Sequence, residues 1–460
     1  MKARFTWALY ILAIGLFAAI AFHVLEAGKQ LELPIGALPG AYGSHLIEQN
    51  LLNLARLPIA VFIMQLVVVI VTTRACGYLL KKVGQPAVVG EVIAGIILGP
   101  SVLFQLAPGV GAFLFPAASI GYLHVFSQIG LIFFMFVLGL EVDLAMLSKR
   151  AGSAIVISHA SIIFPLVLGI CLSYFLYGYF ALPHTKFSSF ALFMGTALSI
   201  TAFPVLGRIL KEKDLLNTRL GNMALTCAAI DDITAWCLLA LLLAVAKGGT
   251  GEMVLYMVLL ILAYIVVMFV AVRPLVKLLL QKVCRGKDQY TLVVTCVVVL
   301  LSAWCAEVMG IHVLFGAFIA GLIMPKDQGL QGRLIVGVGD ALFIVMLPLF
   351  FACTGLRTRI GSLDSLFYWM IFGLTTVVAV AGKLGGSAIA ARCTGESTRD
   401  SLSIGVLMNT RGLVELVVLN LGLEMGILSD TLFTIMILVA LFTTMMTTPL
   451  LALLQRRRFS

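Results

Sequence analysis

Ala228-Ala-Ile-Asp-Asp-Ile-Thr-Ala-Trp236 places two adjacent carboxylates, Asp231 and Asp232, in the middle of an apolar run over residues 219–246. A helix of about 20 apolar residues is long enough to cross the hydrocarbon core of a membrane. Ionisable groups at that depth are costly, so each one is a functional hypothesis by default. The alternative is a pair of structural acids satisfied by hydrogen bonds. Neighbouring residues on a helix point about 100° apart, so the two carboxylates can have different partners.

Similar apolar runs fill almost the whole chain of 460 residues, which is 61% hydrophobic and 11% charged and has a mean hydropathy of +1.11. Globular soluble chains carry about 25% charged residues, so the composition indicates a membrane protein. We predict an all-α polytopic fold with about 13–14 transmembrane helices. The expected runs lie near residues 6–25, 57–79, 87–105, 122–144, 153–179, 187–210, 219–246, 252–280, 289–309, 311–325, 339–357, 365–391, 398–421 and 429–453.

The net charge of +10 does not indicate a nucleic-acid partner, because the basic residues occupy short loops between apolar runs. We place the N-terminus in the cytoplasm and let each run cross once. Lys383 and Arg411 then stay inside apolar runs, and most of the remaining basic residues fall on the cytoplasmic side. The basic residues that fall outside are Lys29, Arg56, Lys186, Lys247, Arg357 and Arg359. We therefore expect an integral protein of a bacterial inner (plasma) membrane, with both termini in the cytoplasm and basic loops facing membrane lipids.

The first run follows a basic start at Lys2 and Arg4, which is also how a secretory signal peptide begins. Because this run is longer than a typical signal core, we favour an uncleaved signal-anchor helix. The cysteines are scattered singly without a CxxC spacing, so they predict packing residues rather than a metal site. No nucleophile–base set stands out, so we expect neither an enzyme nor a bound cofactor.

An internal repeat is visible in two pairs of short motifs. Gly90-Glu-Val-Ile-Ala-Gly95 resembles Gly316-Ala-Phe-Ile-Ala-Gly321, and in the following run of each half a Phe-Phe pair precedes Gly139 or Gly355. Chance similarity between glycine-rich apolar helices is the alternative. If the repeat is genuine, a single linker helix makes the second half enter from the opposite side, giving two inverted six-helix repeats. The predicted division is 1–56 (signal-anchor helix and external loop), 57–250 (first repeat), 251–288 (linker helix) and 289–460 (second repeat).

The fifth run of each half has a polar interruption. The first contains Ser199, Thr201 and Pro204, and the second is Met408-Asn-Thr-Arg-Gly-Leu-Val-Glu415. Broken helices expose backbone carbonyls and aim half-helix dipoles at an ion, as in crossed-helix transporters. The second interruption contributes four further candidate site residues, namely Asn409, Thr410, Arg411 and Glu415.

Lys383 lies within an apolar run and needs a counter-ion, for which Asp231 is the natural candidate. The alternative is that the lysine extends to the cytoplasmic interface. Na⁺, K⁺ and Li⁺ are hard cations that favour oxygen ligands, so Asp232 and Asp231 are the predicted ligands of a transported cation that alternates with a proton. Glu91, inside the first repeat motif, is a secondary candidate.

Four segments resemble the monovalent cation/proton antiporter-2 family, namely residues 89–100, 228–236, 347–352 with Gly355-Leu356, and 408–416. The last of them looks particularly like the plant cation/proton exchanger branch. The resemblance implies the two-domain Na⁺/H⁺ antiporter fold with crossed broken helices and a homodimer. It also implies that Asp232 is the main ion carrier and that Asp231 pairs with Lys383 in the ion-free state. The plant branch usually has Asn-Asp, whereas the double acid is similar to electrogenic bacterial sodium/proton antiporters.

The sequence therefore predicts a secondary active transporter that exchanges Na⁺ or K⁺ for protons by alternating access, electrogenically, as part of pH homeostasis. A K⁺ efflux system with channel-like transport and a Na⁺-coupled organic solute symporter are the alternatives. The charged residues inside the apolar runs cluster at one place in the predicted fold, which favours alternating access over a continuous polar pore. The adjacent acids Asp231 and Asp232 disfavour an anionic substrate.

Overall fold

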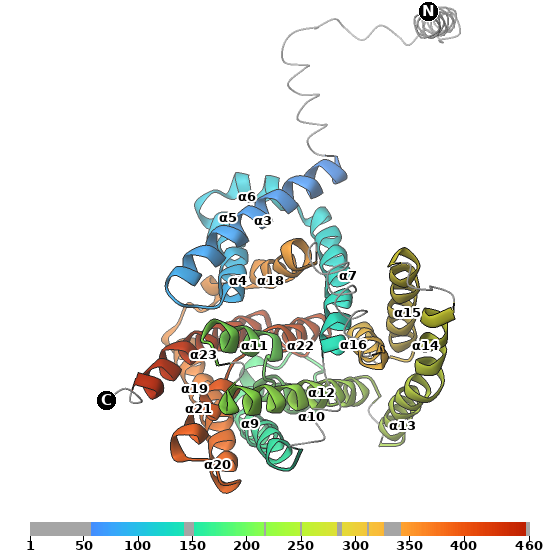
Figure 1. Cartoon of the computed structure of the whole chain (residues 1–460). Helices are drawn as coiled ribbons and strands as arrows, with labels where there is room; N and C mark the ends of the chain where they lie inside the picture. Colours follow the sequence, from blue (N-terminus) through green and yellow to red (C-terminus); the bar gives the residue numbers. More distant parts are fainter. Residues whose placement is uncertain are drawn as a thin grey trace, which may run out of the picture. The chain divides into compact units, whose positions relative to one another are not determined.

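The computed structural model describes residues 57–141, 151–215, 218–248, 251–282, 288–310, 312–325 and 342–456. The chain divides into two units, Met1–Ala60 and Val61–Ser460. The predicted first run, near 6–25, lies outside the described residues. Apart from an isolated bridge between Ala181 and Leu428, the regular structure of the described ranges is helical (Figure 1).

The helices that precede residue 250 are α3 (Pro58–Lys82), α4 (Ala87–Leu98), α5 (Leu103–Leu106), α6 (Pro108–Leu114), α7 (Ala117–Glu141), α9 (Ala151–Phe180), α10 (Phe187–Ser199), α11 (Phe203–Glu212) and α12 (Arg219–Gly248). A linker follows, made of α13 (Gly251–Val267), a π-helical turn (η2, Met268–Val272) and α14 (Arg273–Lys282). The remaining elements are α15 (Asp288–Val308), α16 (Val313–Ile323), η3 (Leu342–Met346), α18 (Leu347–Arg357), η4 (Ile360–Ser362), α19 (Leu366–Val380), η5 (Ala381–Gly385), α20 (Gly386–Cys393), α21 (Thr398–Met408), α22 (Leu413–Glu424) and α23 (Asp430–Arg456).

Ten helices in the described ranges are long and apolar enough to cross a membrane. The predicted runs 187–210, 311–325 and 398–421 are not among them, because each contains only shorter helices. Two of these runs are interrupted by non-helical segments, at residues 200–202, which include Thr201, and at residues 409–412. The order of helices before and after the α13–α14 linker is compatible with two six-helix halves, and that division stays a prediction.

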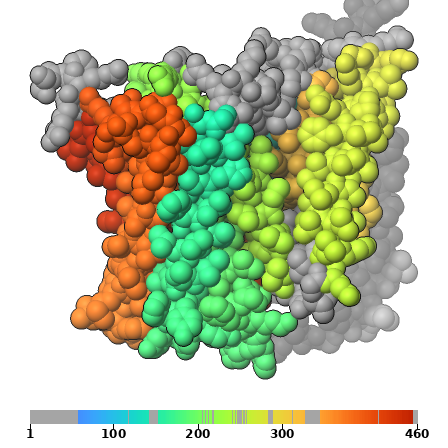
Figure 2. Space-filling view, turned by 90° about the horizontal axis from the view of Figure 1, so that it is seen from below, coloured from blue at the N-terminus to red at the C-terminus, as the bar shows by residue number. Residues whose placement is uncertain are grey.

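The outer surface of this bundle is apolar. Large hydrophobic side chains on α13 are more than half exposed, among them Leu255, Tyr256, Leu259 and Leu262. Figure 2 shows α13 and α14 in yellow along one face, and α20 beside α9 on the same face. Soluble proteins rarely expose a contiguous patch of this kind, whereas lipid tails solvate it.

Glycines from the repeat motifs lie where helices cross. A Cβ on Gly95 of α4 would come 2.1 Å from the Ala352 carbonyl of α18, and one on Gly139 of α7 would come 2.1 Å from the Phe318 carbonyl of α16. The partner helices approach in the same way through Gly355 and Gly321. Helix association in membranes depends on such small residues, because without a side chain the backbones can pack closely. The crossings pair α4 with α18 and α7 with α16.

Candidate ion-binding site

Two broken helices cross at the centre of the site. Helix α10 ends at Ser199 and α11 begins at Phe203, while α21 ends at Met408 and α22 begins at Leu413. The two interruptions bond to each other, because the Ala202 N–H donates to the Thr410 carbonyl at 3.0 Å. Gly412 permits this approach, since a Cβ there would lie 2.7 Å from a methyl group of Val205. Backbone groups that a continuous helix would satisfy internally are thus available at the crossing.

Helix α12 brings Asp231 to this crossing, where its carboxylate is fully buried. Oδ2 accepts hydrogen bonds from Thr201 Oγ1 at 2.6 Å and from Ser161 Oγ at 2.7 Å. Oδ1 accepts a hydrogen bond from Ser158 Oγ. The fourth donor is Lys383 Nζ, 3.0 Å from Oδ2. Asp231 therefore has the hydrogen bonds and the counter-charge that a buried carboxylate needs.

Lys383 lies on the π-helical turn η5, which interrupts the helix formed by α19 and α20. A Cβ on the neighbouring Gly382 would lie 2.8 Å from Pro165 of α9, so glycine lets these helices touch. The lysine ammonium reaches Asp231 and also donates to Ser161 Oγ at 3.0 Å and to the Ser199 carbonyl at the end of α10. All three ammonium protons thus have acceptors. π-helical turns of this kind are common at functional sites.

Asp232 has the opposite environment. Its side chain is 1% exposed, yet in the described part of the chain neither carboxylate oxygen accepts a well-formed hydrogen bond. The backbone N–H of Phe203, at the start of α11, lies nearby. A buried polar group without a partner is rare and calls for an explanation such as an ion or water that binds there. Asn409 adds a further buried side-chain oxygen, Oδ1, that accepts no hydrogen bond from the described residues.

Arg411 holds the crossing together. Its guanidinium donates to the Ala197 carbonyl at 3.1 Å and to the Leu198 carbonyl at 2.8 Å, and pairs with Glu415 Oε1 at 2.9 Å. It thus satisfies two carbonyls at the broken C-terminus of α10, where the helix dipole favours a positive charge. The Arg411 backbone N–H and carbonyl both bond to Thr444 of α23.

The structure brings together most of the residues that the sequence singled out. Some of them contribute a backbone carbonyl to the site rather than the side chain. Ser199 contributes its carbonyl, while its hydroxyl donates to Thr196. Pro204 is the second residue of α11 and follows the break. Thr410 donates its hydroxyl to the Leu407 carbonyl at 2.6 Å, and its own carbonyl bonds the first break. Glu91 is buried on α4, outside the group of contacts around Asp231.

Ser158 and Ser161 were missed by sequence reasoning. They lie on α9 and donate to different oxygens of Asp231. Serine is ordinary in membrane helices, so neither residue carries a signal alone. Their i,i+3 spacing, shortly before Pro165 in an otherwise apolar run, was the available clue.

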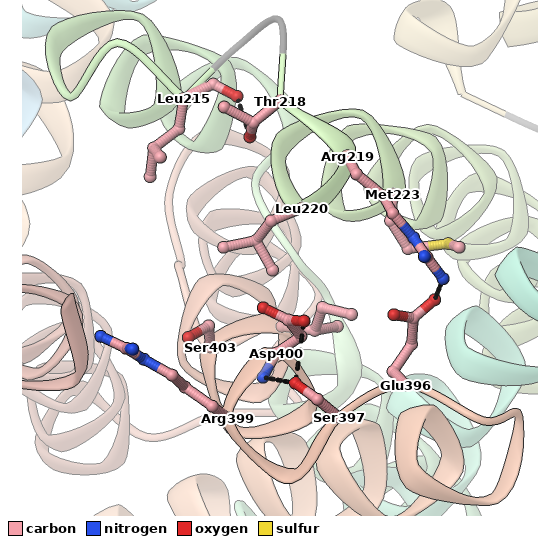
Figure 3. A pocket seen from close by; sticks show the side chains of 11 residues that line it. Leu215, Thr218, Arg219, Leu220, Met223, Glu396, Ser397, Arg399, Asp400 and Ser403 are labelled. Atoms are coloured by element: carbon pink, nitrogen blue, oxygen red, sulfur yellow. Dashed lines mark hydrogen bonds and ion pairs between the residues drawn. The ribbon is translucent and has the colours of Figure 1, made fainter. Parts of the chain in front are cut away.

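A pocket of about 390 Å³ opens between the α11–α12 connection and the start of α21 (Figure 3). Arg219 pairs there with Glu396 at 2.8 Å, and Ser397 bonds to Asp400. The pocket is lined by Leu215, Thr218, Arg219, Leu220, Met223, Glu396, Ser397, Arg399, Asp400, Ser403 and Ile404. Met223 and Ile404 also pack in an apolar cluster with Cys227 and Met408. Cys227 lies one turn before Asp231 on α12, so this apolar cluster adjoins both the pocket and the candidate ion site.

Comparison with known proteins identifies the family of the chain. The family model described as "Sodium/hydrogen exchanger, transmembrane" matches residues 66–453. The chain belongs to the sodium/hydrogen exchanger family. This membership confirms the predicted resemblance, and it identifies the chain as a transporter rather than an enzyme.

Several sodium/hydrogen exchanger relatives are similar over most of this chain. Na(+)/H(+) antiporter NhaS4 of Synechocystis is 42% identical, over 84% of this chain and 95% of its own length. Cation/H(+) antiporter 17 of Arabidopsis thaliana is 39% identical over 84% of this chain. K(+)/H(+) antiporter 1 of Saccharomyces cerevisiae is 35% identical over 85%. The chain spans about half the length of the plant and yeast relatives, at 47% and 46%.

The solved structure of the sodium proton antiporter MjNhaP1 from Methanocaldococcus jannaschii at pH 8 has the same fold. Its TM-score is 0.65 at 15% sequence identity, with 86% of this chain and 96% of that chain covered. The predicted fold class, an all-helical polytopic antiporter fold, is confirmed.

Proposed function

We propose that this exchanger moves a monovalent cation, Na⁺ or K⁺, against protons by alternating access, with Asp232 as the group that binds either ion. The observation that carries the proposal is the buried carboxylate of Asp232, whose oxygens accept no well-formed hydrogen bond from the described residues, beside the fully bonded Asp231–Lys383 pair. A dehydrated cation or a proton would supply the partner that Asp232 lacks. Relatives named as Na⁺/H⁺ and K⁺/H⁺ antiporters support both cations as candidates.

The charges at the crossing support one bound monovalent ion. Asp231, Asp232 and Glu415 are fully buried, as are Lys383 and Arg411. With every group ionised, the three acids exceed the two bases by one negative charge. A single Na⁺, K⁺ or proton neutralises it as long as Lys383 stays protonated, and exchange of one cation for one proton then leaves the buried charge unchanged.

The second proton of electrogenic exchange would come from Lys383. When a cation enters, Asp232 releases its proton to water, and Lys383 leaves Asp231 and releases a second proton. Two protons then move for each cation, so the exchange carries net charge and responds to membrane potential. We further propose a homodimer in a bacterial inner membrane, with cytoplasmic termini and a role in pH homeostasis.

Ion-driven proton movement in proteoliposomes that contain only this protein tests the proposal. Na⁺, K⁺ and Li⁺ are compared over pH 6–9, with Asp232→Asn beside the unmodified chain. We expect a cation-dependent pH change that Asp232→Asn abolishes, and a rate that follows an imposed potential.

Asp364→Asn is the matched control, because Asp364 makes the same chemical change in an exposed loop before α19. Its flux should equal that of the unmodified chain. If no cation moves protons, or if Asp232→Asn keeps full activity, the proposal is wrong. Exchange that ignores the imposed potential would reject only the electrogenic part.

A further inference from the structure

The helices around the crossing belong to two packed sets. Helices α9, α10, α12, α21, α22 and α23 carry the ion site and pack on one another, and we call them the site set. Helices α4, α7, α16 and α18 pack together as the scaffold set. The sets meet where α18 contacts α22, and where α23 contacts α4 and η4. A movement of one set against the other would therefore break the bonds at these contacts.

Charged side chains join the two sets at the end where α18 and α22 finish. Arg357 of α18 donates to Glu424 Oε1 at 2.7 Å and to Asn420 Oδ1 at 3.1 Å, one turn apart on α22. His124 of α7 adds to the contact, because its Nε2 lies 3.4 Å from the same Glu424 oxygen. Asn420 in turn donates to Thr354 Oγ1 of α18 at 2.9 Å. Helices α7 and α18 are thus both joined to α22.

A second charged contact lies at the same end. The Arg359 backbone N–H donates to Thr434 Oγ1 of α23 at 3.1 Å, and its guanidinium lies 3.8 Å from Asp430. Nearer the other end, a neutral hydrogen bond joins the sets, from Gln85 Nε2 before α4 to the Met445 carbonyl of α23 at 3.2 Å. The bonds between these described residues thus place the charges at one end.

The pair of Arg357 and Glu424 can open at small cost. Its side chains are 27% and 40% exposed, whereas those of Arg411 and Glu415 at the crossing are fully buried. Water solvates both partners when an exposed pair separates, so such a pair shifts an equilibrium between two states only about two- to fivefold. Separation of a buried pair has no such compensation and is much costlier. The exposed pair can therefore open and close in each transport cycle.

We infer that Arg357 and Glu424 form a latch that closes the exchanger at this end and releases when the end opens. The inference rests on the proposed function, in which the ion site is exposed to one side of the membrane at a time. Helix α22 runs from the break at residues 409–412 to Glu424, so separating Glu424 from α18 opens a route along α22 towards the crossing. Asn420 and Thr354 are buried on that route, one turn behind the latch.

Thiol labelling of the purified protein in detergent measures opening of the latch without transport and without regard to orientation. In a variant without native cysteines, Thr354→Cys places a thiol behind the latch, and Ser173→Cys places one at a fully buried position of α9. We expect Glu424→Gln or Arg357→Gln to raise the labelling rate at residue 354 about two- to fivefold. Asp364→Asn, which removes an exposed carboxylate outside the latch, should leave that rate unchanged. An equal rise at residue 173 would indicate general loosening and overturn the inference.

Reversal of the pair separates a charge contact from simple packing. Arg357→Glu or Glu424→Arg alone brings like charges together, so each should raise the labelling rate at residue 354 more than the neutral variants do. The combined variant restores opposite charges and should label within about twofold of the unmodified pair. A combined variant that labels as fast as the single ones would contradict the latch.

A cross-link tests the latch during exchange. Thr354→Cys with Asn420→Cys places two thiols where the side-chain atoms now lie 2.9 Å apart, on the two sides of the closed contact. Oxidation should arrest exchange in proteoliposomes and dithiothreitol should restore it, whereas either cysteine alone should leave exchange insensitive to oxidation. Cross-linked protein that exchanges at full rate overturns the inference. If labelling responds as expected but no variant moves a cation, the latch is supported and the proposed function fails.

Discussion

Asp231 and Asp232 are adjacent in sequence and chemically opposite in the structure. Asp231 faces α9 and η5 and has four donors, whereas Asp232 is buried without a hydrogen-bond partner among the described residues. The angular step of about 100° between neighbours on a helix permits this separation of roles. One carboxylate can then anchor the site while the other exchanges its ligand.

Arg411 gives a prediction at this scale. Arg411→Gln removes a fully buried guanidinium group that donates to the Ala197 and Leu198 carbonyls and pairs with Glu415. We expect it to destabilise the protein by about 3–5 kcal/mol, because it leaves a buried acid and two carbonyls unpaired. Arg411→Lys should recover only part of this loss, since an ammonium lacks the planar fork.

Thermal unfolding in detergent measures both variants. Arg359→Gln is the control, because Arg359 faces Asp430 at 3.8 Å with both side chains more than half exposed. Such a surface pair contributes about 0–1 kcal/mol. If Arg411→Gln unfolds at the same temperature as this control, then Arg411 does not hold the crossing together.

At the scale of elements, glycines and helix interruptions position the site. Gly95 and Gly355 allow α4 and α18 to touch, and Gly139 and Gly321 do the same for α7 and α16. The breaks at Ile200–Ala202 and Asn409–Gly412 leave backbone groups free to bond across the crossing. The π-helical turn η5 carries Lys383 at the contact with α9.

Gly95→Val tests the close crossing of α4 and α18. A Cβ at this position would lie 2.1 Å from a backbone carbonyl, which no rotation of a side chain can relieve. We expect a loss of folded protein, seen as low recovery from the membrane and a broad, early peak on size-exclusion chromatography. Gly121→Ala is the control, because a Cβ on Gly121 meets nothing within 4 Å. That variant should keep or slightly raise stability, since alanine favours a helix by about 1 kcal/mol over glycine. Normal yield of Gly95→Val would contradict the close crossing.

At the scale of the whole molecule, polar clusters lie at both ends of the helices. The pocket lined by Arg219, Glu396 and Ser397 is at the end of α12 that the charge pattern assigns to the cytoplasm. At the opposite end, Arg357 of α18 contacts Glu424 of α22 at 2.7 Å, and His124 of α7 lies 3.4 Å from the same carboxylate. The positive-inside pattern predicts that this second end faces outward.

Cysteine labelling tests that orientation. In a variant without native cysteines, Ser397→Cys and Asp364→Cys introduce single thiols at exposed positions, one beside the pocket and one before α19. A membrane-impermeant maleimide added to intact cells should label residue 364 and spare residue 397. Permeabilised cells should show labelling at both positions, which controls for reactivity. The reverse pattern in intact cells would invert the predicted topology.

The sequence by itself determined the class of the protein and most of the residues of its candidate site. Apolar runs of membrane-spanning length can be read directly from the sequence. An acid pair or a lysine inside such a run can also be recognised there, because a charge buried in the membrane is costly and therefore indicates a function. Asp231, Asp232, Lys383 and the two polar interruptions could therefore be found without coordinates. Serines carry no such cost, so Ser158 and Ser161 gave no comparable signal.

Only the tertiary structure decided which groups meet. Hydrogen bonds between α9, α12 and η5 join residues more than 60 positions apart, as do the bonds between the two breaks. No local pattern encodes that, among the described residues, Asp231 receives four side-chain donors and Asp232 receives no well-formed hydrogen bond, because the orientation of α12 is fixed by the packing of its neighbours. The sequence thus identified the buried charged residues, and the crossing of the broken helices determined which groups each of them contacts.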